Sequence, residues 1–110
     1  MSLDAEIAAL ARAVRESPED AMARYRWRCA LVRAGRGSEA GFEVGDVVWT
    51  ELYAKRFKPS GQFVTGRVDK LRAVAALHRV VVQGPWPRRL WRADNELTLL
   101  EPARPQSVPA

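Results

Sequence analysis

The chain has 110 residues and a mass of 12.3 kDa, with 18 basic and 13 acidic side chains, a formal charge of +5 and a pI of about 10.1. This length suits one domain that can bury a core without disulfides or a structural metal. A single cysteine, Cys29, and a single histidine, His78, exclude a disulfide framework and a zinc site built from Cys and His. The longest apolar run, Ile7 to Ala11, is too short to cross a bilayer. We therefore expect a soluble, cytoplasmic protein.

The first 37 residues have the periodicity of two helices. In the first helix the apolar residues recur every three or four positions, at Leu3, Ile7, Leu10 and Val14. This spacing puts them on one stripe of a helix that should end near Glu16. Ser17 is then the predicted N-cap of a second helix, with Pro18 at its first position and acidic residues in its first turn. Gly35 predicts the end of that helix.

The second helix carries two apolar stripes. One comprises Met22, Tyr25, Cys29 and Val32, and the other comprises Ala23, Trp27, Ala30, Leu31 and Ala34. Arginines fill the gaps between the stripes, and among them is Arg28. Two stripes indicate two packing partners, namely the first helix and either the rest of the chain or a second subunit. A homodimer through the second stripe is therefore one expectation.

Residues 41–102 change to Val, Trp, Gly and alternating patterns that predict strands. The expected strands are Asp46 to Glu51, Gln62 to Leu71, His78 to Gln83, Arg88 to Arg92 and Leu97 to Glu101. Residues 73–77 fit either a loop or a helical turn. Five short strands bury their faces by curling into a small barrel. The expected fold is α+β, with a helical hairpin (1–37) packed on a five-stranded barrel (38–102) as one compact unit, followed by a disordered tail (103–110).

Four stretches of this region carry a resemblance to a known superfold. They read "VGDVVWTEL", "SGQFVTGRVDKL", "RVVVQGPW" and "NELTLLEP". A Gly-Asp pair opens the first strand, a Gly precedes an aromatic residue on the second, and a short polar turn leads into the last. In these features the region resembles the Src-homology-3-like barrels of the Tudor and KOW type. That resemblance implies a small barrel, but it implies no single function, because the superfold hosts readers of methyl-lysine, nucleic-acid binders, peptide binders and a reductase.

Tudor-type readers hold a cation in an aromatic cage, so the resemblance points to specific positions. Tyr53 falls near the first cage aromatic and Trp86 near the last, whereas the intermediate positions hold Val64 and Gln83. A cage needs several π faces around one cation. We therefore expect Trp86 to cover an end of the barrel rather than to build a cage.

The helical region also resembles the junction of two tetratricopeptide repeats in the stretch "ALARAVRESPEDAMARYRWRCALVRAGR". Only one such hairpin is present, and a stable solenoid needs at least three repeats. The resemblance therefore implies a capping hairpin and not a peptide-binding superhelix.

No residue pattern predicts catalysis. Cys29 sits on an apolar helical stripe and His78 begins a strand, so we expect a packed thiol and an edge histidine rather than a nucleophilic pair. Carboxylates are scattered among arginines at spacings typical of solvated faces, at Asp46, Glu51, Asp69, Asp94 and Glu96. We expect no enzyme activity, cofactor or metal.

Basic and aromatic residues make up the leading functional hypothesis. Residues 41–102 hold ten basic and seven acidic side chains, a net charge of +3. The predicted binding residues are Tyr53, Lys55, Arg56, Phe57 and Lys58 in one cluster, and Trp86, Arg88, Arg89, Trp91 and Arg92 in the other. Cations can track phosphates while aromatic rings stack on bases. The two loops of such barrels often share one side, so one patch is expected to bind nucleic acid.

A protein or peptide partner is the alternative. The interior of a small barrel has difficulty holding all of the large aromatic residues Trp49, Tyr53, Phe57, Trp86 and Trp91. Exposed Trp and Tyr beside Arg are typical of interface hot spots. Against this, Trp27 and Trp49 could simply join the hairpin to the barrel.

Overall fold

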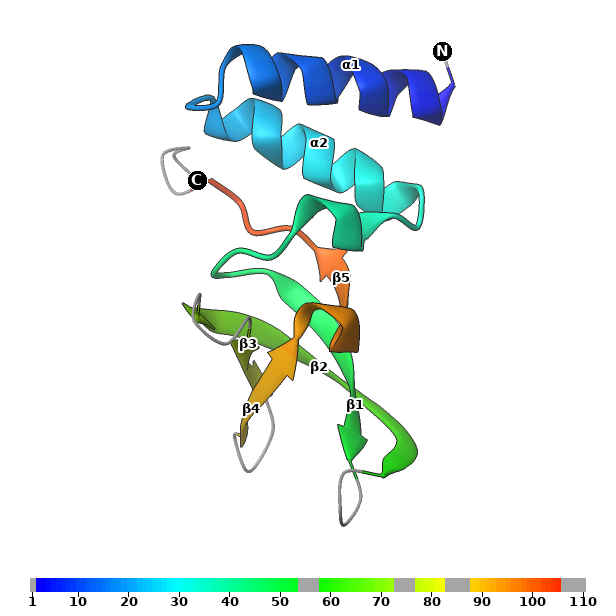
Figure 1. Cartoon of the computed structure of the whole chain (residues 1–110), viewed down its shortest axis with the longest axis vertical. Coiled ribbons are helices and arrows are strands. Elements are labelled where there is room, and N and C mark those ends of the chain that lie inside the picture. Colours follow the sequence, from blue (N-terminus) through cyan, green and yellow to red (C-terminus); the bar gives the residue numbers. More distant parts are fainter. Residues whose placement is uncertain (1, 54–57, 73–76, 83–87, 106–110) are drawn as a thin grey trace.

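The computed structural model describes residues 2–53, 58–72, 77–82 and 88–105. Two helices, α1 (Leu3–Glu16) and α2 (Ala21–Arg33), and a short 3-10 helix, η1 (Gly37–Ala40), come first (Figure 1). Five strands follow, β1 (Val47–Tyr53), β2 (Pro59–Arg72), β3 (Leu77–Val82), β4 (Arg88–Ala93) and β5 (Leu97–Glu101), with a 3-10 helix, η3 (Asp94–Glu96), before the last. The predicted α+β class is confirmed, and each strand begins and ends within three residues of its predicted position.

The strands form one antiparallel sheet in the order β4-β3-β2-β1-β5. Closure into a barrel was expected, but the sheet is open, since β4 and β5 pair only with β3 and β1 among the described residues. The reason lies in what covers the inner face. Phe42, which precedes the sheet, joins the sheet core, and Val32 of α2 packs against it. Segments outside the sheet therefore bury apolar surface that closure would otherwise have to bury.

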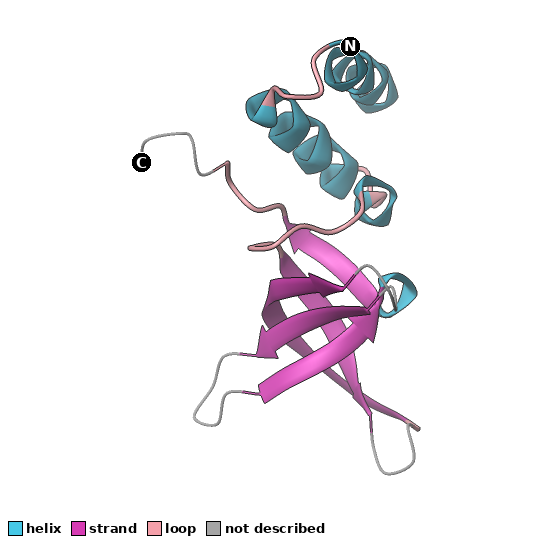
Figure 2. Cartoon of the chain, turned by 60° about the vertical axis from the view of Figure 1, so that its left-hand side comes forward, coloured by secondary structure: helices cyan, strands magenta, loops and turns pink. Residues whose placement is uncertain are grey.

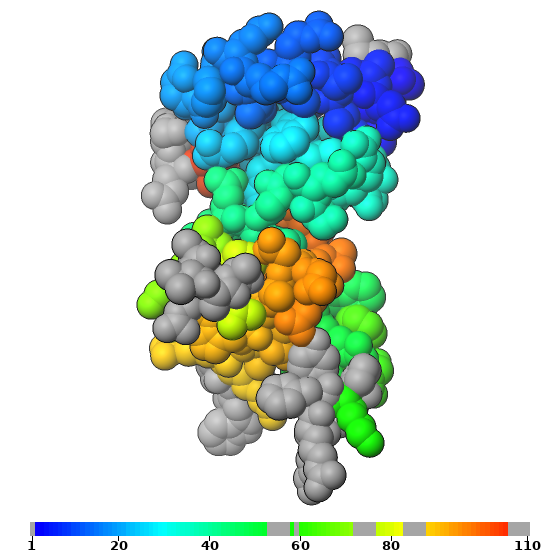
Figure 3. Space-filling view, in the orientation of Figure 1, coloured from blue at the N-terminus to red at the C-terminus, as the bar shows by residue number. Residues whose placement is uncertain are grey.

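The sheet core consists of inward-facing residues of β1, β2, β3 and β5. Its buried members in the sheet are Val48, Val68, Val80, Leu97 and Leu99. Because side chains alternate along a strand, the residues between them point to the opposite, outer face of the sheet. The molecule is elongated, measuring 46 × 29 × 28 Å, with the helical hairpin at one end and the strands at the other (Figure 3).

Helix α2 lies between α1 and the sheet (Figures 1 and 2). Its second apolar stripe packs against α1, where Ala30 and Leu31 form a buried cluster with Ile7, flanked by Trp27 and Ala34. From the first stripe, Val32 packs on the sheet core. The two partners of α2 are thus α1 and the rest of the chain, and the homodimer expected through the second stripe has no support, since α1 occupies that stripe.

The start of α2 differs from the prediction. Ser17 is the C-cap of α1, and the N-cap of α2 is Asp20, whose Oδ1 accepts from the N–H groups of Met22 and Ala23 at 3.1 and 3.0 Å. The two residues between the caps form a turn, closed by a hydrogen bond from Asp20 N–H to the Ser17 carbonyl at 3.0 Å. Pro18 therefore lies in the turn and not at the first position of α2. This short connection lets the two helices fold back on each other.

The predicted end of α2 at Gly35 is confirmed. Gly35 has a φ of 71°, in the left-handed region that glycine tolerates best. Its N–H donates to the Val32 carbonyl at 3.0 Å, and Arg36 N–H donates to the Leu31 carbonyl at 2.8 Å. This paired pattern satisfies carbonyls at the helix end and turns the chain toward η1.

The chain after β5 runs back toward α2. Pro102 is buried, and Ala103 N–H donates to a carboxylate oxygen of Asp46 at 2.8 Å. Residues 103–105 begin the segment that was predicted to be disordered, but this hydrogen bond to Asp46 holds Ala103 in place. Residues 106–110 lie outside the described residues. Of the ambiguous segment 73–77, residues 73–76 also lie outside them, and Leu77 is the first residue of β3.

Candidate nucleic-acid interface

The structure describes only some of the predicted binding residues. Lys55, Arg56, Phe57 and Trp86 lie outside the described residues, as does Gln83 of the tested cage. Tyr53 is described as the last residue of β1, through its backbone alone. Lys58, Arg88, Arg89 and Trp91 are exposed, and Arg92 is buried. The candidate interface must therefore be built from strand residues.

The two predicted clusters adjoin strand ends that point away from the helical hairpin (Figures 1 and 2). One junction is marked by the pairing of Tyr53 with Pro59, and the other by the pairing of Val82 with Arg88. However, Val82 pairs opposite Gly66, in the middle of β2. Seven residues of β2 separate the junctions, about 23 Å of strand at ~3.3 Å per residue. The register thus separates the described strand ends beside the two clusters, whereas most residues of the predicted patch lie outside the described residues.

Strand β4 divides its basic residues between two faces. Leu90 and Arg92 point inward, and the guanidinium of Arg92 donates to the carbonyls of Trp91 and Glu51 at 2.9 and 3.4 Å. With only 8% of its surface exposed, Arg92 leaves the predicted surface cluster because alternation along the strand turns it toward the interior. Arg89 and Trp91 remain on the outer face.

The outer face also carries arginines that lie outside the two predicted clusters, namely Arg67 and Arg79. Arg67 of β2 and Arg89 of β4 both pair with Val81 of β3, so the two arginines stand in one row across three strands. Arg79 of β3 lies opposite Trp91, with its guanidinium carbon 5.9 Å from the centre of the Trp91 ring. Three arginines and a tryptophan therefore share the outer face of β2, β3 and β4.

Aromatic residues continue this face onto β1. Trp49 and Phe63 are 42% and 50% exposed, and their ring centres lie 4.5 Å apart. The expectation that Trp49 joins the hairpin to the barrel is wrong, because Val48 and Thr50 fill the inward positions and leave Trp49 facing outward. Alternation around Val48 was the sequence signal that could have placed it there.

The carboxylate of Asp69 partly neutralises the positive charge of the outer face. Asp69 accepts two hydrogen bonds from Arg79, at 2.8 and 2.9 Å. These bonds, with a smaller contribution from the charge of Arg89, hold the pKa of Asp69 below its ordinary value, so Asp69 is ionised at neutral pH. Arg67 and Arg89 form no ion pair with any described residue. Both arginines therefore contribute positive charge to the face that no described carboxylate pairs with.

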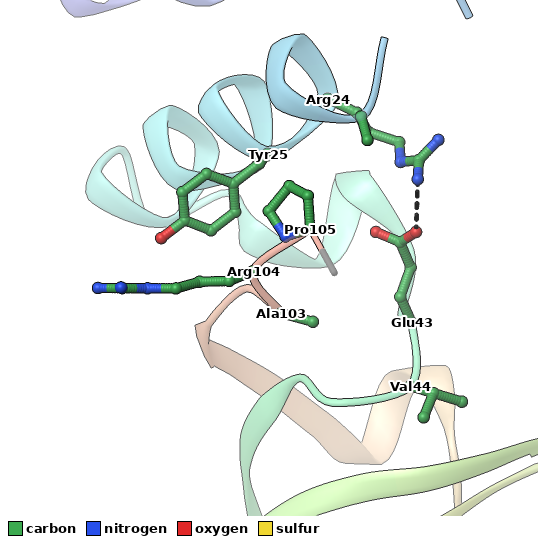
Figure 4. Close-up of a pocket in the computed structure, with 8 residues that line it drawn as sticks. Arg24, Tyr25, Glu43, Val44, Ala103, Arg104 and Pro105 are labelled. Carbon is green, nitrogen blue, oxygen red and sulfur yellow. Dashed lines mark ion pairs between the residues drawn. The ribbon is translucent and has the colours of Figure 1, made fainter. Parts of the chain in front are cut away.

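A separate cavity of about 280 Å³ lies between α2 and the chain that follows β5. Figure 4 shows Tyr25 and Arg104 on one side of it and Arg24 on the other. Arg24 pairs with Glu43 at 3.3 Å, and hydrogen bonding with the Cys29 side chain is the main cause that raises the pKa of Tyr25 above its ordinary value. Arg24 and Glu43 neutralise each other, which leaves Arg104 as the remaining charged side chain among the described residues that line this cavity.

The carboxylate of Asp46 and the guanidinium of Arg28 form a buried ion pair, 0% and 1% exposed. Arg28 Nη1 donates to Asp46 Oδ1 at 2.9 Å, and a second bond joins Nη2 to Oδ2. The prediction that Asp46 belongs to a solvated face is wrong, since the guanidinium of Arg28 neutralises it inside the protein. This pair connects α2 to the turn before β1 and has a structural role.

The described residues contain no group of three or more His, Cys, Asp or Glu side chains placed to hold a metal ion. None of the described helices has the length and apolar character needed to span a membrane.

The chain was also compared with known proteins. A scan against family models finds no match, and searches of curated proteins and of solved structures likewise return no significant match.

Proposed function

We propose that this protein is a non-enzymatic binding module that holds nucleic acid on the outer face of its sheet. The observation that carries the proposal is the row formed by Arg67 and Arg89 across β2 and β4, bordered by the exposed ring of Trp91. Arginines in one row on the two strands that flank β3 present several donors to a phosphate backbone at a fixed spacing. An adjacent aromatic face can contact bases or sugars.

The proposal extends to the type of sheet. We assign it to the Src-homology-3-like small barrels of the Tudor and KOW type, in an open form. Support comes from the Gly45-Asp46 pair just before β1, from Gly61 two residues before Phe63 on β2, and from the polar 3-10 turn η3 that leads into β5. In this assignment the helical hairpin caps the sheet, and the protein acts in the cytoplasm.

The electrostatic argument predicts how binding should respond to salt. Each phosphate that an arginine neutralises releases counterions, so the logarithm of affinity falls linearly with the logarithm of salt concentration. Asp69 already neutralises Arg79, and so Arg67 and Arg89 are the arginines of this face that should contact phosphates.

Fluorescence anisotropy with labelled nucleic acids between about 50 and 200 mM salt tests the proposal. Changing both Arg67 and Arg89 to Ala should weaken binding and reduce the salt slope by about 1.4 to 1.8, the contribution of two phosphate contacts. The matched control changes Arg12 and Arg15, which are exposed on α1, so that the same charge is lost at the other end of the molecule. Equal effects of the two double variants, or no binding at low salt, would contradict the proposal.

A protein or peptide partner is the second candidate, favoured by the exposure of Trp49 and Phe63. Exposed aromatic rings beside arginines suit the core of a protein interface as well. If the protein binds no nucleic acid at low salt, a protein or peptide becomes the favoured ligand of the outer face.

A further inference from the structure

The pair formed by Trp49 and Phe63 exposes aromatic surface that no described segment covers. Their rings contact each other at 4.5 Å with an interplanar angle of 40°, and both remain about half exposed. Trp49 lies on β1 and Phe63 on the neighbouring strand β2. Contiguous exposed apolar residues of this size generally mark a binding surface.

Both rings stand on well-paired strands. Trp49 is paired on both sides, opposite Thr65 of β2 and Thr98 of β5, and Phe63 is paired opposite Glu51. The backbone beneath the rings is therefore held by hydrogen bonds on neighbouring strands. The protein backbone under the rings therefore loses little conformational entropy when a ligand stacks on them, which favours affinity.

The aromatic pair is continuous with the arginine row. Phe63, Thr65 and Arg67 occupy successive outward positions of β2. The backbone positions of Phe63 and Arg67 are therefore about 13 Å apart along the strand. Arg89 stands two strands beyond Arg67, about 10 Å across the sheet. One surface therefore offers ring faces at one end and two cations at the other.

We propose that the ligand of this face is single-stranded nucleic acid, whose bases stack on Trp49 and Phe63 while its phosphates follow Arg67 and Arg89. This inference rests on the proposed function and specifies its ligand. The reason is access, because a duplex keeps the faces of its bases stacked inside the helix, whereas a single strand can turn them onto aromatic side chains. A peptide would use the rings but has no regular series of anions for the arginine row.

Paired titrations test this inference with one single-stranded oligonucleotide of about 12 nucleotides, within the site sizes known for small barrels, and its duplex. The variant combines Trp49→Leu with Phe63→Leu, which keeps apolar bulk and charge but removes both rings. Its affinity for the single strand should fall about 5- to 150-fold for each base that stacks, with the salt slope unchanged. Affinity for the duplex should stay the same.

Leu71→Ala provides the control, since Leu71 is 42% exposed on the same strand but lies beyond the arginine row. Thermal unfolding verifies that each variant folds, and Phe63→Leu alone serves if the double variant does not. Unchanged single-strand affinity in the ring variant, or equal wild-type affinity for duplex and single strand, would overturn the inference. If the arginine variant still lowers the salt slope in that case, the proposed function stands without it, whereas absence of any binding at low salt removes both.

Discussion

Asp46 is the residue on which three segments of the chain meet. Its carboxylate pairs with Arg28 of α2 and accepts from the backbone N–H groups of Glu43 and Ala103, each at 2.8 Å. Arg28 also forms an ion pair with Glu43 at 2.8 Å. A buried carboxylate requires such partners, because without them it would lose its hydration and gain nothing in return. Asp46 thus links the helical hairpin, the turn before β1 and the chain after β5.

We expect Asp46→Ala to lower the free energy of unfolding by about 3–5 kcal/mol, since it leaves the guanidinium of Arg28 buried without its main counter-charge. Urea denaturation followed by circular dichroism measures the change. Asp69→Ala is the matched control, because Asp69 also pairs with an arginine through two bonds but lies at the surface, where solvent screens the pair. Similar losses for both variants would show that burial does not set the strength of the Asp46 contacts.

At the scale of the element, a local signal placed α2 but misplaced its first residue. Ser17 and Asp20 are both good N-cap residues, and the proline between them favours either a helix start or a turn. The structure uses Ser17 to end α1 and Asp20 to begin α2. The choice depends on how closely α1 and α2 pack, which no local pattern contains.

Asp20→Ala should destabilise the protein by about 0.5–2 kcal/mol, because the N–H groups of Met22 and Ala23 lose their acceptor. Ser17→Ala should have little effect, since the recorded cap contact of Ser17 is made by its backbone N–H to the Ala13 carbonyl. Thermal unfolding of the two variants measures the difference. If Ser17→Ala lost more stability than Asp20→Ala, Ser17 and not Asp20 would be the N-cap of α2.

Strand alternation explains the candidate site at the same scale. In β4, a basic cluster that looked continuous in the sequence separates into Arg89 outside and Arg92 inside. In β1, the same period of two turns Trp49 toward solvent. The alternation was visible in the sequence, but which of the alternate residues face inward depends on how the strand packs against the core.

At the scale of the whole molecule, α2 belongs to two cores at once. Ala30 and Leu31 pack with α1, whereas Val32 packs on the sheet, and Arg28 reaches the turn before β1. Neighbouring residues of one helix thus contact both halves of the protein. Structural units that share buried contacts unfold together.

We therefore expect the hairpin and the sheet to unfold in one transition. Trp27→Arg, which places a charge in the cluster between α1 and α2, should lower the stability of both halves by about 1–3 kcal/mol. Residue-resolved NMR during thermal unfolding, with Val48 and Val80 reporting the sheet and Leu31 the hairpin, measures this. Arg26→Ala, at an exposed position of α2, is the control. A sheet that keeps its wild-type midpoint in Trp27→Arg would show two independent units.

The helices and strands of this protein can be predicted from its sequence, because helical spacing, alternation and glycine stops are local properties of the chain. It located two helices and five strands to within a few residues and ended α2 at Gly35. Only the tertiary structure decided that the sheet stays open, that Arg28 and Asp46 are buried together, and that Arg67, Arg89, Trp49 and Phe63 share one face. These features depend on register and packing between residues far apart in the chain, and a linear pattern does not specify which distant residues become neighbours.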